Sequence, residues 1–211
     1  MPSRALECLS GSASVLFPVI ALPTERPNMN IWHDVDPDRI KPADFLAVIE
    51  ITKGSKKKYE LDKETGMIIL DRILYTSTHY PANYGFIPRT YAEDGDPLDV
   101  LVLCSEPIIP AALVHCTPIG MLSMIDEGFV DHKVIAVPVH DPVYNGYRNI
   151  ANLPRHISDE IMHFFSVYKT LEGKVTAIES VTDAAEAVKV IARDIETYNR
   201  MRRNGDFDRE P

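Results

Sequence analysis

The sequence predicts a mainly β protein with some α structure (α+β), in which short strands form a small closed barrel and two helices follow. Two observations favour this class. Residues 45–139 hold several short apolar or alternating runs of uneven length that are interrupted by bends. The last third then changes to the period of amphipathic helices. The length of 211 residues suits one domain with a full core.

The N-terminal residues differ in composition from the rest of the chain. Ser and Pro are frequent there, and a short apolar run, VLFPVIAL, occupies residues 15–22. A secretory signal is a weak interpretation, because the run contains a proline and lacks a clear small-residue cleavage site. An organelle transit peptide and an upstream start with non-functional residues stay open. We expect a flexible arm over residues 1–29 and a single domain over residues 30–211.

The first strands are expected at residues 45–52, 57–62 and 67–72. The first of them alternates around Glu50, and the other two flank a Gly-containing turn, which predicts a β-hairpin. Because strand side chains repeat every two residues, Lys58 and Glu60 should share one face. We interpret the tyrosine-rich run at residues 80–88 and the acidic run at residues 93–99 as loops.

Three more strands are expected at residues 100–104, 113–125 and 133–139. VLVLC, the first of them, is apolar at every position, which is typical of a strand that is buried on both faces. The second contains Pro118 and Gly120, where we expect a bulge or a bend.

Two helices are expected in the last third. The first should begin at a Ser158 cap and continue through DEIMHFFSVYKTL. Its apolar stripe is Ile161, Phe164, Phe165 and Tyr168. The second should begin near Asp183, with Glu186 as its capping-box partner, and end at basic residues before Gly205. Its apolar stripe is Val188, Ile191, Ile195 and Tyr198.

Charge and composition exclude several classes of protein. The net charge of −9 argues against a general nucleic-acid binder, which needs a basic face. Three cysteines without a CxxC pair, Cys8, Cys104 and Cys116, indicate neither a zinc knuckle nor a disulfide framework, so a cytoplasmic location is the default. No apolar run approaches the ~20 residues of a membrane-spanning helix, so we expect no membrane partner.

The acidic run EDGDPLD places Glu93, Asp94, Asp96 and Asp99 within seven residues. Such crowding of negative charge is unfavourable unless a cation balances it, and Mg²⁺ and Ca²⁺ prefer oxygen ligands. An EF-hand is excluded, since the twelfth position counted from Asp94 is Ser105 rather than Glu. For this run alone, a solvated loop is as good an interpretation as a metal site.

A second acidic group lies in MIDEGFVDHK, which contains Asp126, Glu127 and Asp131 before Lys133. Taken alone, this segment is best interpreted as a polar hairpin connection. Lysine, arginine and tyrosine side chains elsewhere could hold phosphoryl oxygens. These candidates are Lys58, Arg72, Tyr80, Tyr84, Tyr168 and Lys169.

Together these segments resemble the soluble family I inorganic pyrophosphatases. The resemblance covers about residues 30–200 in order, and DGDPLD is similar to the signature of that family. The segments that carry it are KYELD (58–62), DR (71–72), YPANYGFIP (80–88), EDGDPLDVLVL (93–103), MIDEG (124–128), DHK (131–133) and HFFSVYK (163–169). The resemblance implies a five-stranded OB-like closed β-barrel with the two C-terminal helices packed on it.

The resemblance also implies Mg²⁺-dependent hydrolysis of pyrophosphate to two orthophosphates, and a role for each matching residue. Asp96 would be the general base that accepts a proton from the attacking water. The implied metal ligands are Asp94, Asp99, Asp126 and Asp131. The implied substrate-binding residues are Lys58, Arg72, Tyr84, Lys133, Tyr168 and Lys169. The implied supporting residues are Glu50, Glu60 and Tyr80.

Charge counting is consistent with several metal ions. The seven implied carboxylates and four implied cations leave three negative charges, and pyrophosphate would add roughly three or four more at neutral pH. About three or four Mg²⁺ ions would bring the occupied site near neutrality.

Three alternatives remain: an oligonucleotide-binding barrel, a Ca²⁺ or Mg²⁺ module without turnover, and a hydrolase of polyphosphate or nucleotide anhydrides. Members of the family are commonly oligomeric and bacterial ones often hexameric, so the resemblance implies a homo-oligomer. His115, His132 and His163 lack a paired ligand at metal spacing and are expected to be structural or surface residues.

Overall fold

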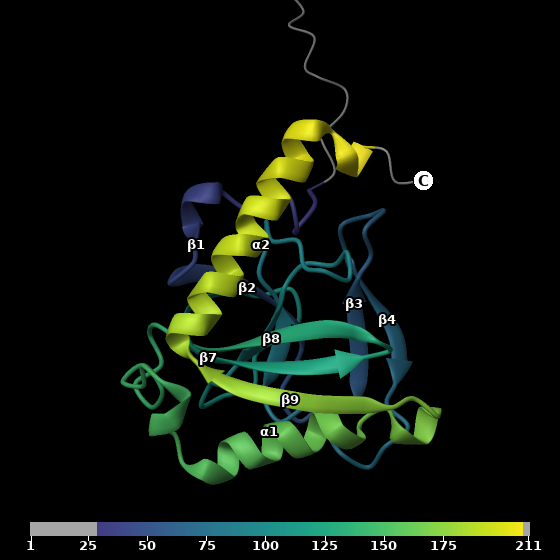
Figure 1. Ribbon diagram of the computed structural model, residues 1–211, viewed down its shortest axis with the longest axis vertical. Helices are drawn as coiled ribbons and strands as arrows, with labels where there is room; N and C mark the ends of the chain where they lie inside the picture. Colours follow the sequence, from purple (N-terminus) through teal and green to yellow (C-terminus); the bar gives the residue numbers. More distant parts are fainter. Residues whose placement is uncertain (1–28, 209–211) are drawn as a thin grey trace, which may run out of the picture.

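The computed structural model describes residues 29–208, which form a mixed β-sheet, a separate hairpin and two α-helices (Figure 1). The expected N-terminal arm lies outside the described residues apart from Met29. The strands are β1 (Ile40–Lys41), β2 (Asp44–Ile51), β3 (Lys57–Leu61), β4 (Ile68–Ile73), β5 (Asn83–Phe86), β6 (Asp99–Val102), β7 (Leu113–Asp126), β8 (Phe129–Pro138) and β9 (Thr176–Asp183). The α-helices are α1 (Arg155–Val167) and α2 (Ala184–Asn204). The 3-10 helices are η1 (Pro37–Arg39), η2 (Ile150–Asn152), η3 (Thr170–Glu172) and η4 (Asp206–Asp208).

The main sheet has the strand order β1-β2-β5-β6-β8-β7-β9, and β2 also pairs with β7. This extra pairing joins β2, β5, β6, β8 and β7 into a ring. The β6–β8 pair is parallel and the other pairs are antiparallel. The α+β class is therefore confirmed, whereas the five-stranded OB-like closed barrel stays a prediction.

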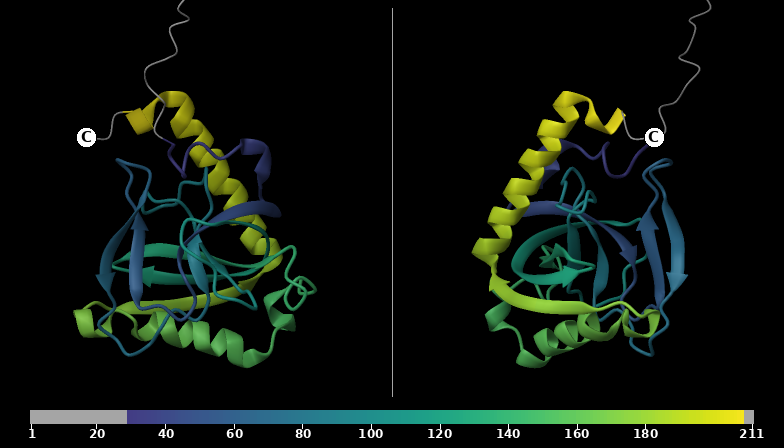
Figure 2. Two further views of the ribbon diagram at one scale, coloured as in Figure 1. Left: turned by 180° about the vertical axis from the view of Figure 1, so that it is seen from behind. Right: turned by 45° about the vertical axis from the view of Figure 1, so that its right-hand side comes forward.

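Strands β3 and β4 form a two-stranded sheet of their own (Figures 1 and 2). Figure 2 shows this hairpin standing beside the main sheet in both views. The expected hairpin is thus confirmed. The expected irregularity in β7 is also confirmed, since the β7–β8 register shifts between Pro118 and Gly120.

The interpretation of residues 80–88 as a loop was wrong, because β5 lies inside it. All four residues of β5 are buried between β2 and β6. Gly85 permits this close approach, since a Cβ there would lie 1.9 Å from the carbonyl oxygen of Val48. The sequence analysis also missed β9, which pairs with β7 and leads into α2.

The start of the first helix was also predicted wrongly. Helix α1 begins after Pro154, so Ser158 lies inside the helix rather than at its cap. The apolar stripe extends one turn further back than expected, because Ile157 packs against the core with Ile161. Helix α1 lies beneath β9 in Figure 1 and contributes Phe164 and Phe165 to that core.

Helix α2 begins as expected. The Asp183 side chain accepts a hydrogen bond from the backbone N–H of Glu186, and Gly205 ends the helix in a left-handed conformation. The expected apolar stripe was partly wrong, since Val188 is only half-buried and Ile195 lies at the edge of a second core cluster. The buried stripe is Ala187, Val190, Ile191, Asp194 and Tyr198.

Two of the three core clusters of the described residues join the sheet to the two helices. One joins α1 to β5, β6, β7 and β8, and the other joins α2 to β2, β6, β7 and β8.

Within the described residues, no helix is long and apolar enough to cross a membrane. Cys104 and Cys116 are free thiols.

Candidate active site

An open cavity of about 1040 Å³ lies between the β3–β4 hairpin and the main sheet. Every site residue predicted from the sequence lines it except Arg72 and Tyr80. The predicted residues that line it are Glu50, Lys58, Glu60, Tyr84, Asp94, Asp96, Asp99, Asp126, Asp131, Lys133, Tyr168 and Lys169. The fold therefore brings segments that are far apart in the sequence to one place.

The acidic run forms a tight turn that leads into β6. The backbone N–H of Asp96 donates to the Asp94 carboxylate over 3.1 Å, and the backbone N–H of Ala92 donates to the carbonyl of Asp96 over 2.8 Å. Asp99 is the first residue of β6. The turn exposes the Asp96 side chain, which has 55% of its surface accessible, while Asp99 faces the interior of the cavity.

Lys133 lies at the centre of the buried part of the cavity. Its Nζ lies 2.7 Å from Asp99 Oδ2 and 2.8 Å from Asp131 Oδ2, and it donates to Tyr84 Oη over 2.9 Å. Tyr84 Oη also donates to Asp99. Burial alone would lower the pKa of Lys133, but Asp131 and Asp99 outweigh it and raise this pKa well above its ordinary value. Lys133 therefore stays charged.

The pKa values of the neighbouring carboxylates are raised as well, because burial disfavours their charged form. Burial raises the pKa of Asp99 to about 6, although Lys133 opposes this shift. Burial also raises the pKa of Asp94 and, together with the charge of Asp99, raises the pKa of Glu50 well above its ordinary value. Glu50, on β2, is only 6% exposed. Burial in the cavity therefore favours the protonated form of these three carboxylates.

The β7–β8 hairpin positions the second acidic group. Its two turn residues, Glu127 and Gly128, have φ angles of 51° and 94°, which are the positive values of a type I′ turn. The expected polar hairpin connection is thus present. Asp126 contacts Lys169 and accepts a hydrogen bond from Tyr168 Oη over 3.3 Å, while its buried Oδ1 has no hydrogen-bond partner.

The hairpin supplies cations from the other side of the cavity. Lys58 contacts Glu60, as expected from their shared face, and lies 3.3 Å from Asp71. Burial lowers the pKa of Lys58. Arg72 contacts Asp71, and its Nη2 lies 3.0 Å from Glu172 of η3, so this guanidinium lies at the side of the cavity rather than in its lining.

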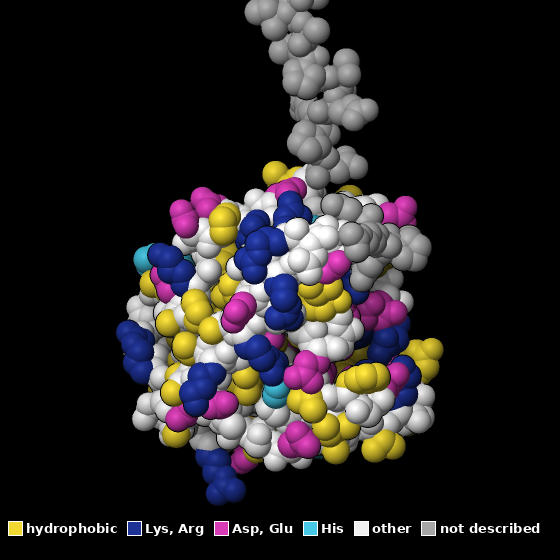
Figure 3. All heavy atoms as spheres, turned by 45° about the horizontal axis from the view of Figure 1, so that its top comes forward, with side chains coloured by type: hydrophobic (Ala, Val, Ile, Leu, Met, Phe, Trp, Pro, Cys, Tyr) yellow, Lys and Arg dark blue, Asp and Glu magenta, His cyan; other side chains and the backbone are white. Residues whose placement is uncertain are grey.

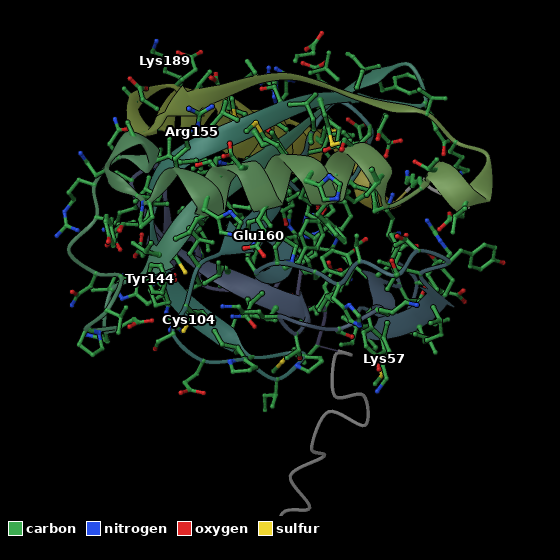
Figure 4. All side chains as sticks on the ribbon, turned by 90° about the horizontal axis from the view of Figure 1, so that it is seen from below. Lys57, Cys104, Tyr144, Arg155, Glu160 and Lys189 are labelled. Atoms are coloured by element: carbon green, nitrogen blue, oxygen red, sulfur yellow. The ribbon has the colours of Figure 1, made fainter. Side chains whose placement is uncertain are left out.

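Tyr80 lies behind the cavity wall. Its ring packs against Tyr84 and Phe164 with centroid distances of 5.3 and 4.7 Å, and it is 2% exposed. It also lines a second cavity of about 510 Å³ on the underside of the molecule. Figure 4 labels Cys104, Tyr144 and Glu160 of that second cavity. Tyr80 therefore supports the first cavity without lining it.

The sequence analysis missed several residues at the first cavity. Trp32, His33 and Phe207 form an aromatic wall from the two ends of the described chain, and Lys63 reaches Asp96 from the hairpin turn. In the sequence His33 and Lys63 stand next to Asp34 and Asp62, and these pairs do not indicate the contacts that His33 and Lys63 make in the fold. The sequence analysis gave Glu93 no catalytic task, and its side chain forms an ion pair with Arg193 of α2 over 3.1 Å.

The donor set suits a hard divalent cation. Asp94, Asp99, Asp126 and Asp131 offer carboxylate oxygens, one of them buried and unpartnered. Among residues 29–208, however, no group of three His, Cys, Asp or Glu side chains is already arranged to hold a metal ion. Lys133 and Lys169 lie between the carboxylates instead. The residue types fit Mg²⁺, and binding would require these side chains to separate.

Comparisons with known proteins decide the family. The family model described as inorganic pyrophosphatase matches residues 47–199. The chain is 48% identical over 167 residues to soluble inorganic pyrophosphatase 2 of Chlamydomonas reinhardtii. The match covers 79% of this chain and 87% of that protein. The chain belongs to the soluble family I inorganic pyrophosphatases. It is also 47% identical over 172 residues to the inorganic pyrophosphatase of Aquifex pyrophilus, covering 80% of this chain and 97% of that one.

Solved structures of inorganic pyrophosphatases share the fold. The enzyme from Thermus thermophilus superposes with a TM-score of 0.77 at 38% identity, covering 81% of this chain and 99% of that one. The enzyme from Helicobacter pylori superposes with a TM-score of 0.73 at 40% identity, and the match covers 76% of this chain and 96% of that one. The resemblance inferred from the motifs is thus confirmed, and so is the assignment of the chain as an inorganic pyrophosphatase.

Proposed function

We propose that this inorganic pyrophosphatase requires Mg²⁺ and hydrolyses pyrophosphate to two orthophosphates by direct attack of water, with Asp96 as the general base. The observation that supports this most is the arrangement of the cavity. Carboxylates from the acidic run and the β7–β8 hairpin lie on one side, and cations from the β3–β4 hairpin lie on the other. Pyrophosphate hydrolysis needs both groups. The cations hold the negatively charged phosphoryl oxygens, and the carboxylates hold the metal ions that assist the attack of water.

Asp94, Asp99, Asp126 and Asp131 would hold the metal. When bound, Mg²⁺ would balance the negative charge of the crowded carboxylates and of the phosphoryl oxygens. It would also favour ionisation of a water molecule. The count of net charge supports about three or four ions with substrate bound.

The side chains that hold pyrophosphate are Lys58, Arg72, Lys133 and Lys169, with the hydroxyls of Tyr84 and Tyr168. The ammonium and guanidinium groups would bind phosphoryl oxygens directly, and the hydroxyls would donate hydrogen bonds without adding charge. Negative charge on the leaving phosphate would be stabilised by these same groups. Glu50, Glu60 and Tyr80 would support the metal-binding and phosphate-binding side chains.

Asp96 is suited to accept the proton. Its carboxylate is half exposed at the cavity rim, within reach of water, and its backbone is fixed by the turn. A carboxylate Oδ that takes one proton from water needs no covalent intermediate on the protein. The proton would leave to solvent after the phosphates separate.

The charge pattern on one face of the molecule favours this function over oligonucleotide binding. Lys and Arg side chains are interspersed with Asp and Glu over the face shown in Figure 3, without a continuous basic stripe. An oligonucleotide-binding barrel needs a basic groove with exposed aromatic rings. A metal-binding module without turnover would not need the lysines that converge on the carboxylates.

Phosphate release from pyrophosphate tests the proposal, measured with Mg²⁺, with excess chelator and with Ca²⁺. We expect release that depends on Mg²⁺, and much slower release from ATP under the same conditions. Absence of Mg²⁺-dependent release would overturn the proposal. Faster release from ATP than from pyrophosphate would instead favour a hydrolase of nucleotide anhydrides.

Further predictions concern the protein as a whole. We propose that the ring of β2, β5, β6, β8 and β7 is an OB-like barrel, that the protein is cytoplasmic, and that it forms a homo-oligomer, a hexamer by family resemblance. The exposed apolar side chains Leu70 and Ile73 of β4 would suit a contact between subunits. Light scattering coupled to size-exclusion chromatography checks the oligomeric state.

A further inference from the structure

The two walls of the active-site cavity belong to different sheets. Lys58 and Arg72 lie on the β3–β4 hairpin, whereas the acidic run precedes β6 of the main sheet. No ladder of backbone hydrogen bonds connects the two sheets within residues 29–208. The distance between the walls therefore depends on the loops at the base of the hairpin and on the contacts that the hairpin makes with its surroundings.

The tip of the hairpin makes such contacts through one lysine. Lys63 Nζ lies 2.7 Å from Asp96 Oδ1 and donates to the carbonyl oxygen of Gly95 over 3.2 Å. The same ammonium group lies 6.0 Å from the centroid of the Trp32 ring, which is within reach of a cation–π interaction. Lys63 thus joins the hairpin to the residue proposed as general base.

Backbone packing supports the same docked position. Gly66, in the hairpin turn, lies so close to Asn30 that a Cβ on it would be 2.7 Å from the Asn30 Cα. The turn is closed by its own hydrogen bonds, from Asp62 N to Met67 O over 2.7 Å and from Gly66 N to Asp62 O over 2.8 Å. The tip is therefore a formed turn that docks as a unit, and Lys63 is its ionic contact with the acidic run.

We propose that Lys63 is a positioning residue for pyrophosphate hydrolysis. Its bridge to Asp96 and Gly95 orients the Asp96 carboxylate and holds the tip of the hairpin against the opposite wall of the cavity. This inference rests on the proposed role of Asp96. Lys63 is assigned to the acidic run rather than to the substrate, because the Asp96 carboxylate and the Gly95 carbonyl oxygen that it contacts both belong to that run.

The contact is too exposed to matter much for overall stability. The side chains of Lys63 and Asp96 are 42% and 55% exposed, and ion pairs in such positions contribute little to the free energy of folding. The far end of the hairpin is held separately by Arg72 and Glu172. Loss of Lys63 should therefore loosen the tip and misorient Asp96 while the protein stays folded.

The first measurement compares kcat and KM for pyrophosphate in Lys63→Met, Lys63→Arg and Lys189→Met. Lys189 is the matched control, because it also forms an exposed 2.7 Å ion pair, with Glu186 on α2. Figure 4 shows Lys189 at the opposite end of the molecule from Lys57 of the hairpin. We expect kcat of Lys63→Met to fall about tenfold, since small misplacements of a reacting group are costly.

We expect KM to change less than threefold in Lys63→Met, since the cations that would hold the phosphates remain. Lys63→Arg should recover kcat to within about threefold, and Lys189→Met should match the unchanged protein. A kcat for Lys63→Met within twofold of the unchanged protein overturns the proposal. So does a Lys63→Arg variant that is as impaired as Lys63→Met.

The second measurement needs neither metal nor substrate. Backbone amide hydrogen exchange over residues 61–67 should become about tenfold faster in Lys63→Met, but not in Lys63→Arg or Lys189→Met. Trp32 is the only tryptophan of the chain, so its quenching by acrylamide reports the same opening. Unchanged exchange in Lys63→Met overturns the docking role. If the unchanged protein released no phosphate from pyrophosphate, the proposed function would be wrong. Hydrogen exchange would still show whether Lys63 holds the tip of the hairpin in place.

Discussion

The two walls of the cavity differ in what holds them in place. On the acidic wall, β6 is buried at Val100, Leu101 and Val102, each 0% exposed, and is paired on both sides. On the cationic wall, β4 exposes Ile69 and Leu70 by 56% and 49%, and the hairpin pairs only with itself. The comparison teaches that the carboxylates are positioned by a buried ladder, whereas the hairpin cations are positioned by ion pairs at the two ends of the hairpin.

The largest effect is expected on the acidic wall, from Asp96→Asn. The amide cannot accept the proton from water, so kcat should fall by about 10²–10⁴-fold. Affinity for Mg²⁺, measured by calorimetry without substrate, should change little, because Asp94 and Asp99 remain. Asp159→Asn on the exposed side of α1 serves as the control, and near-normal turnover in Asp96→Asn would exclude the general-base role.

The next effect concerns the ladder that holds the acidic wall. Gly85→Ala would place a Cβ against the Val48 carbonyl and should lower the free energy of unfolding by about 3 kcal/mol. Urea denaturation measures it. Gly146→Ala is the matched control, since a Cβ there meets nothing within 4 Å. Equal stabilities for the two variants would contradict the close packing of β5 on β2.

A smaller effect is expected where ion pairs hold the cationic wall. Glu172→Gln removes the charge that faces Arg72 across 3.0 Å, so the guanidinium should be less well oriented toward phosphate. We expect KM for pyrophosphate to rise about tenfold, the size of one weakened charge-assisted hydrogen bond. Steady-state kinetics measures it against Glu179→Gln on exposed β9. An unchanged KM would argue that Arg72 is held by Asp71 alone.

The smallest effect is expected for an exposed ion pair on the acidic wall. Glu93→Gln breaks the contact with Arg193, but β6 still holds the acidic run. The free energy of unfolding should change by less than about 1 kcal/mol, and kcat should stay within twofold. Thermal denaturation and steady-state kinetics measure the two quantities. A large loss of kcat would mean that α2 also positions the acidic wall.

Features with local causes could be predicted from the sequence. The β3–β4 hairpin, the irregularity at Pro118 and the Asp183 cap each follow from residues within a few positions of one another. Strand β5 could not, because its polar Asn83 is 0% exposed and is satisfied by distant backbone groups. The burial of β5 is visible only in the assembled sheet.

The candidate site divides in the same way. The motifs predicted most of the side chains that line the cavity. Arg72 and Tyr80 lie beside the cavity instead, where Arg72 pairs with Glu172 and the Tyr80 ring packs on Phe164, and their predicted roles stay predictions. The contacts that tie the walls together were not predicted. Lys63 reaches Gly95 across 32 residues of sequence, and Arg193 reaches Glu93 across 100. Such separations leave no periodic pattern in the sequence.

The aromatic wall at the two described ends has a consequence for the order of folding. His33 Nδ1 and Tyr198 Oη lie 2.8 Å apart although 165 residues separate them, and Trp32 packs on Phe207. Closing so long a segment of chain is entropically costly until the sheet has brought its ends together. We therefore expect this contact to form after the main sheet, with Trp32 fluorescence recovering in the last phase of refolding.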